Sequence, residues 1–199
     1  MPWKGSYVEM LTQDLTDLTG KLLIAMPGMS DPRFAHSIVL LCAHGDEGAM
    51  GLVVNKLAEN VTFGTLLEQL EISHDTARST FPVHFGGPVE SGRGFVLHAD
   101  DYQSNDSSLW FGDRFGMTAT LDVLEDIAEA RGPDRAILAL GYAGWGPAQL
   151  EGELQENAWL VAEAAHDLVF DSENDRKWAA ALQSLGIDPL TLSAAAGRA

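Results

Sequence analysis

The sequence is poor in cysteine and in basic residues, and both shortages limit what the protein can do. A single cysteine, Cys42, among 199 residues excludes an intramolecular disulfide framework and any Cys-x-x-Cys redox or zinc motif. Lys plus Arg number 12 against 29 Asp plus Glu, which gives a formal net charge of −17. A protein that tracks nucleic-acid phosphates needs clustered Lys and Arg, so we expect no direct nucleic-acid contact.

Long hydrophobic runs are also missing. The first apolar run, 22–26, ends at Pro27, and the first 20 residues hold only one lysine. A secretory signal needs a basic start followed by about 7–15 apolar residues, and a membrane span needs about 20 apolar residues. The sequence therefore predicts a cytoplasmic protein that makes no membrane contact.

The hydrophobic pattern that is present predicts strands first, in hairpins, and then strands that alternate with helices. It favours an α+β fold, a single domain with a central mixed, largely antiparallel β-sheet flanked by short α-helices. Residues 1–17 are expected to form an N-terminal arm, flexible or helical, and 18–199 the domain. The predicted strands are 21–26, 37–43, 50–55, 81–85, 94–99, 109–111, 135–142 and 159–162, and the predicted helices are 63–70, 121–128, 148–157 and 174–185.

Four blocks of sequence follow one another along the chain: 20–29 (GKLLIAMPGM), 42–55 (CAHGDEGAMGLVVN), 86–89 (GGPV) and 141–159 (GYAGWGPAQLEGELQENAW). In this order they resemble the YqgE/AlgH family of small bacterial proteins. The resemblance implies an α+β fold on a central mixed sheet and no settled activity, and one member has been named a regulator of alginate synthesis genes. The family usually has glycine where this chain has Ala148, which would affect any ligand that approaches the backbone closely there.

Three residues are candidates for catalysis, namely Cys42, His44 and His84. On a regular strand, Cys42 and His44 would point to the same face about 6.6 Å apart, so the histidine could activate a thiolate nucleophile. In the alternative interpretation Cys42 is a buried apolar residue and His44 a turn residue.

A metal site is a further possibility that the histidines raise. His44, His84 and His98 each follow or end a predicted strand, and three imidazoles can hold zinc with one open position. Their spacing fits no local zinc motif, and buried histidines are often satisfied by backbone carbonyls. We therefore expect neither a metal nor a cofactor.

The turns after the predicted strands are the candidate binding region. Gly86 and Gly87 could offer backbone N–H groups to an anion, or could simply form a turn that needs positive φ. Aromatic side chains where the chain leaves a buried strand could wall a small pocket. The expected ligand-binding groove consists of Asn55, Gly86, Gly87, Tyr142, Gly144, Trp145 and Gln149.

Acidic residues concentrate near this groove in the sequence. Residues 122–175 contain 13 Asp and Glu against Arg131 and Arg135. A neutral or cationic ligand, or a basic protein surface, is therefore a better partner than a phosphate. Together these features predict a regulatory protein, or one that binds a small metabolite or a protein partner. The alternative is an enzyme that acts on a small polar substrate through Cys42, His44 or His84.

Overall fold

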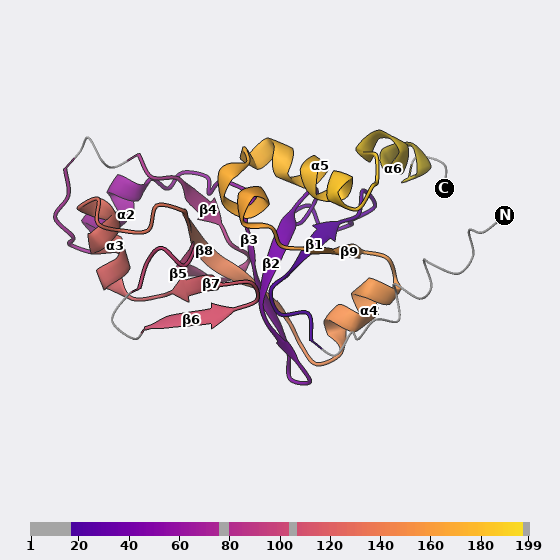
Figure 1. Ribbon diagram of the computed structural model, residues 1–199, viewed down its shortest axis with the longest axis horizontal. Coiled ribbons are helices and arrows are strands. Elements are labelled where there is room, and N and C mark those ends of the chain that lie inside the picture. Colours follow the sequence, from indigo (N-terminus) through magenta and orange to yellow (C-terminus); the bar gives the residue numbers. More distant parts are fainter. Residues whose placement is uncertain (1–16, 76–79, 104–106, 197–199) are drawn as a thin grey trace.

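The computed structural model describes residues 17–75, 80–103 and 107–196, so the predicted arm lies almost wholly outside the described residues. Figure 1 shows the order of the elements. The strands are β1 (Lys21–Ala25), β2 (Ile38–Gly45), β3 (Gly48–Val53), β4 (Val83–Phe85), β5 (Val89–His98), β6 (Ser108–Phe111), β7 (Phe115–Thr118), β8 (Ala136–Trp145) and β9 (Trp159–Glu163). The helices are α2 (Phe63–Gln69), α3 (Leu121–Ala128), α4 (Gln149–Gln155), α5 (Asn174–Ser184) and α6 (Pro189–Ala196), with a π-helix, η2, at Asp167–Asp171.

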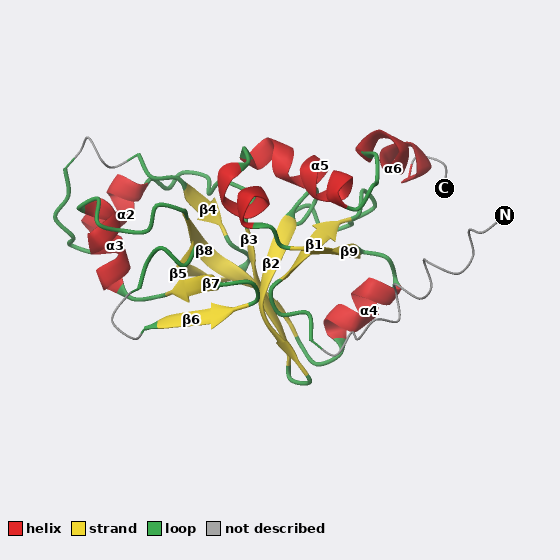
Figure 2. Cartoon of the chain, viewed as in Figure 1, coloured by secondary structure: helices red, strands yellow, loops and turns green. Residues whose placement is uncertain are grey.

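The strands form one mixed sheet in the order β6-β7-β5-β8-β3-β2-β1-β9, with β4 pairing beside β8 (Figure 2). Every strand pair is antiparallel except β4 with β8, which is parallel. This arrangement confirms the predicted α+β class with a central, largely antiparallel sheet. No helix in the described part of the chain is long and apolar enough to cross a membrane.

Strand β8 connects the two halves of the sheet. Its first part pairs with β5 and β4, and its last part, from Ala143 to Trp145, pairs with β3. Between them Gly141 has a φ of +71°, which glycine adopts at little cost. Strand β8 therefore changes its partner from β5 to β3 at this glycine and belongs to both halves of the sheet.

Three hydrophobic clusters fill the space between the sheet and its helices. The first contains Leu22, Ile38 and Phe115 together with Trp178 of α5, so α5 and η2 cover that face of the sheet. The second contains Leu23 and Trp145 on the opposite face, where α4 packs. The third joins α2 and α3 to β5 and β8 at the far end of the molecule, at the left of Figure 1.

Local sequence signals placed most elements correctly. Thr62 caps α2 through a reciprocal hydrogen-bond pair with Thr65, as its position before an apolar run predicts. Three elements, β7, η2 and α6, were not predicted. The β7 segment has only four residues, and three of them are buried while Met117 is half-buried. A segment this short shows no clear period.

Candidate functional site

Cys42 and His44 do not share a face of β2. The register between β2 and β3 shifts between Leu41 and Ala43, so a bulge interrupts the alternation of side chains around Cys42. The thiol is buried in the first hydrophobic cluster, where Sγ donates to the carbonyl of Leu40 at 3.6 Å. His44 instead turns towards α4. The geometry does not favour a cysteine–histidine pair.

Burial also controls the chemistry of the thiol. Removal from water raises the pKa of Cys42 to about 12, so the reactive thiolate is scarce at neutral pH. We expect native protein to resist iodoacetamide at pH 8 while protein unfolded in urea is alkylated stoichiometrically, as measured by intact-protein mass spectrometry. Native alkylation as fast as that of a free cysteine peptide would show that the thiol is accessible and activated.

His44 has a defined tautomer and a structural partner on α4. The backbone N–H of Leu18 donates to Nδ1 at 3.0 Å, so Nε2 carries the proton and donates to Oε1 of Glu151 at 2.8 Å. The His44 side chain is 2% exposed, whereas the Glu151 side chain is 33% exposed. These contacts therefore fix Leu18 and α4 against β2, and leave the imidazole little room to meet a substrate.

His84 belongs to a second, separate polar cluster. Its Nε2 lies 3.0 Å from Nδ2 of Asn174 on α5, and its buried Nδ1 has no hydrogen-bond partner among the described residues. Burial lowers the pKa of His84, and the charge of Lys177 lowers it further. The three proposed catalytic residues thus lie in three different environments.

Lys177 is the residue of this cluster that sequence reasoning missed. Its side chain is among the largest fully buried ones, and Nζ donates to the carbonyl of Val54 at 2.8 Å. Burial lowers the pKa of Lys177 to about 8. Lys177 lies four residues before Ala181, which faces the core, and this spacing puts both residues on one face of the helix. The spacing could therefore have indicated that Lys177 is buried. A lysine on an amphipathic helix is, however, normally assigned to the solvent side.

The histidines also do not converge on a metal. His98 is fully buried, with Nδ1 donating to the carbonyl of Ala99 and Nε2 accepting from the Thr118 hydroxyl, both at 2.9 Å. Within the described ranges, no group of three or more His, Cys, Asp or Glu side chains is arranged to hold a metal ion. The interpretation of a buried histidine that is satisfied by a backbone carbonyl fits His98. His44 and His84 have side-chain partners instead.

Gly86 and Gly87 lie where two chain segments cross. The N–H of Gly86 donates to Leu140 and its carbonyl accepts from Val53, both at 2.8 Å, so these groups belong to the sheet. A Cβ on Gly87 would lie 2.0 Å from the carbonyl carbon of Tyr142. The two glycines are therefore required for close backbone packing, whereas an anion nest would need free N–H groups.

The remaining groove candidates lie on both sides of the sheet. Tyr142 packs at the edge of the first cluster against Phe95, and Trp145 lies in the second cluster, on the opposite face. Their positions, an odd number of residues apart on one strand, account for this separation. Asn55 accepts from the N–H of Ile38 and donates to the carbonyl of His36, so it connects two loops. Tyr142 and Trp145 do not wall a common pocket.

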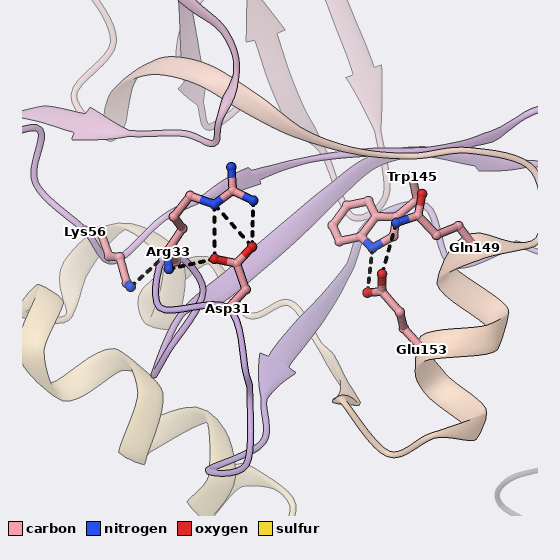
Figure 3. A network of polar contacts seen from close by, with 6 residues as sticks. All are labelled: Asp31, Arg33, Lys56, Trp145, Gln149 and Glu153. Atoms are coloured by element: carbon pink, nitrogen blue, oxygen red, sulfur yellow. Dashed lines mark hydrogen bonds and ion pairs between the residues drawn. The ribbon is translucent and has the colours of Figure 1, made fainter.

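Gln149 and Trp145, by contrast, are brought together by Glu153 on α4 (Figure 3). One carboxylate oxygen accepts from the indole N–H groups of Trp145 at 2.9 Å and Trp159 at 2.8 Å, and the other accepts from Gln149 at 3.1 Å. Gln149 also accepts from the N–H of Gly146 at 3.0 Å, next to the exposed Gly144. A single carboxylate thus holds the start of α4 against two tryptophans.

Ala148, immediately before α4, adopts a φ of +59°. This left-handed conformation disfavours residues with a Cβ, and glycine adopts it freely. The family usually has glycine at this position, and the left-handed backbone conformation before α4 is sufficient to explain that preference. The preference does not require a ligand that approaches the backbone.

A second group of charged residues lies on the same side of the sheet as Trp145 (Figure 3). Asp31 accepts three hydrogen bonds from the Arg33 guanidinium, at 3.0, 3.1 and 2.7 Å, and this contact lowers the pKa of Asp31. Lys56 donates to the carbonyl of Arg33 at 2.9 Å. Phe34, next to Arg33, packs edge-on against Trp159 at 5.7 Å, which connects the two groups through aromatic rings.

Comparison with known proteins assigns the chain to a family. A family model described as AlgH-like matches residues 22–190. A UPF0301 protein of Ruegeria pomeroyi is 61% identical over 92% of this chain and all of its own length, and one of Jannaschia sp. is 57% identical over 96% of this chain and all of its own. The solution structure of AlgH from Pseudomonas aeruginosa has 40% sequence identity and a TM-score of 0.76, covering 94% of this chain and 98% of its own. A crystal structure from Corynebacterium diphtheriae, at 19% identity and a TM-score of 0.68, covers 96% and 98% of the two chains and shares the fold. This chain therefore belongs to the AlgH-like family.

Proposed function

We propose that this protein is a cytoplasmic regulatory protein that binds a small polar metabolite or a partner segment, and that it acts without direct DNA contact. The proposed binding region is the α4 surface, defined as Asp31, Arg33, Lys56, Trp145, Gln149 and Glu153. The observation that carries the proposal is the placement, on one side of the sheet, of fixed charges of both signs around a row of aromatic rings.

Half-buried phenylalanine rings at the edge of the aromatic row supply contact area for a ligand, whereas Trp145 and Trp159 are buried, at 7% and 3% exposure. Phe34 is half-buried, and its ring meets Trp159, which in turn lies 6.1 Å from Trp145. Phe85 is also half-buried against the same cluster. Binding sites combine apolar rings of this kind with a few fixed polar groups that set orientation.

The charges would supply specificity. Arg33 is held by Asp31 and its side chain stays 57% exposed, so it can reach a ligand without losing its orientation. Gln149 is exposed on the helix side, and Glu153 is half-buried beside it. A ligand with a cationic and an anionic end would match Glu153 and Arg33 respectively. The proposed α4 surface therefore includes Trp145 and Gln149 of the predicted groove. It does not include Gly86, Gly87 or Tyr142.

Arg33→Ala provides the sharpest test, because Arg93 is a matched control. Both arginines are equally exposed, at 57% and 56%, both pair with a carboxylate, and both lie over a phenylalanine ring. We expect amide NMR titration with arginine, glutamate, citrate, ATP and spermidine to give shifts for at least one compound at residues 29–34, 56 and 145–153. Arg33→Ala should weaken that response at least tenfold, and Arg93→Ala should leave it unchanged.

Two outcomes would contradict the proposal. One is a response to these compounds that maps away from the α4 surface, and the other is equal sensitivity to the two arginine variants. Trp145→Ala is a poor probe, because Trp145 is only 7% exposed and its loss would disturb the core.

A further inference from the structure

Strand β6 ends the sheet on one side and carries exposed hydrophobic side chains. Among the described residues, β7 is the strand that pairs with β6, and Figure 2 shows no described strand beyond the outer edge of β6. Leu109 and Trp110 are 51% and 41% exposed, whereas β9, at the other end of the sheet, has no comparably exposed large hydrophobic residue. A sheet edge of this kind is a template for another strand.

An aromatic wall stands beside this edge. Trp110 and Tyr102 both pack edge-on against the ring of His98, at 5.5 Å and 5.3 Å. Gly116 of β7 lies opposite Trp110, and a Cβ there would come within 2.3 Å of the His98 ring. Because His98 is fixed through both ring nitrogens, the wall is formed in advance of any binding.

The wall borders a pocket of about 470 Å³, and a cation already lies at its rim. Asp100, Tyr102 and Trp110 line this pocket, and Asp100 pairs with the guanidinium of Arg114 at 2.5 Å. The Arg114 side chain is 75% exposed, so it can leave Asp100 at small cost. This intramolecular pair shows that the rim accepts a guanidinium next to aromatic rings.

We propose that β6 is a docking edge for an extended, basic segment of a partner protein. The segment adds as a strand and places an arginine or lysine side chain between Trp110 and Tyr102, on Asp100, in place of Arg114. A strand beside β6 would lie about 4.8 Å away, so a side chain on the Trp110 face would meet that ring directly. Cation–π contact with Trp110 and the charge of Asp100 would then act together.

Charge favours a basic partner over a second copy of this chain. Each copy carries a formal net charge of −17, so an edge-to-edge dimer would bring two strongly acidic molecules together. A basic segment would be attracted by the same field. The site shares no residue with the α4 surface, so the two proposals can fail independently.

The test is selection of random twelve-residue peptides displayed on phage against the full chain, in parallel with the Trp110→Ala and Asp100→Asn variants. We expect enriched peptides to alternate β-branched and polar residues and to contain arginine or lysine. A synthetic copy of the most enriched peptide should bind the wild type at least tenfold more tightly than either variant. Replacement of its basic residue by glutamate should abolish binding.

Glu173→Gln is the control, because Glu173 also pairs with an exposed arginine, Arg176, and lies at the start of α5, which packs on β1 and β2. It should bind the peptide as the wild type does. Thermal unfolding of each variant would confirm that the fold is kept. The proposal is overturned by a lack of enrichment, by enriched peptides that bind all variants equally, or by a dimer in sedimentation equilibrium that Leu109→Lys dissociates.

Discussion

Replacing Gly87 with alanine is expected to destabilise the protein by about 4 kcal/mol or to prevent folding altogether. A Cβ at this position would lie 2.0 Å from the carbonyl carbon of Tyr142 and 2.2 Å from its oxygen. These are backbone atoms of β8, held by pairing between Tyr142 and Val89, so they cannot move aside as a side chain would. The φ of +155° at Gly87 adds a conformational cost for any other residue.

Gly152→Ala is the matched control for this substitution. Gly152 lies within α4, and a Cβ there would have no heavy atom within 4 Å. Alanine should therefore stabilise the helix by about 0.5–1 kcal/mol. Urea unfolding followed by tryptophan fluorescence measures both changes. A Gly87→Ala protein within about 1 kcal/mol of the wild type would show that the two segments do not cross as closely as described.

Replacing Lys177 with methionine is expected to stabilise the protein at neutral pH by about 1–2 kcal/mol. Burial lowers the pKa of Lys177 to about 8, whereas an unfolded lysine has a pKa of about 10.4. Keeping the ammonium charged inside the fold therefore costs about 3 kcal/mol at pH 7. Methionine removes this cost. The loss of the hydrogen bond to the Val54 carbonyl lowers the free energy of unfolding and so offsets part of the gain.

The pH dependence of this effect gives the stricter test. Below pH 8 lysine is protonated in both the folded and the unfolded state, so the full cost is present. As the pH rises from 8 towards 10.4 the folded state holds the neutral amine and the cost disappears. The wild type should therefore gain about 2–3 kcal/mol relative to Lys177→Met between pH 7 and pH 10.

Lys177→Arg separates charge from shape in this experiment. Arginine stays protonated throughout this range, so its variant should not recover stability at alkaline pH. Equilibrium unfolding in urea at each pH supplies the measurement. Parallel stability profiles for the wild type and Lys177→Met would mean that the Lys177 ammonium is hydrated in the folded state.

Much of the fold could be predicted from local patterns, and the reason is periodicity. The buried runs that became β1, β2 and β3 have strand length. Strands β1 and β2 end at proline or glycine turns, β3 begins at Gly48, and Thr62 marks the start of α2. Strand β7 escaped prediction because its four residues are too few to show a period. Its burial depends on pairing with β5 and β6.

The candidate site was less predictable, because it depends on which face each side chain takes after long-range pairing. A single bulge at Cys42 separates that thiol from His44. Strand alternation places Tyr142 and Trp145 on opposite faces. The joint use of Glu153 by two tryptophans requires α4 to fold back over β8 and β9. Binding at Gly144 and Gln149 stays a prediction.

The sequence by itself determined the acidity, the absence of a disulfide framework, the strand-forming segments and the family resemblance, because each is a property of composition or of neighbouring residues. Only the tertiary structure decided that Cys42 is buried, that Lys177 points inwards and that β6 is the exposed edge. Those outcomes follow from the register and order of strands distant in the chain. A local pattern can indicate that a strand forms, but its neighbours and its exposed face are set by the whole sheet.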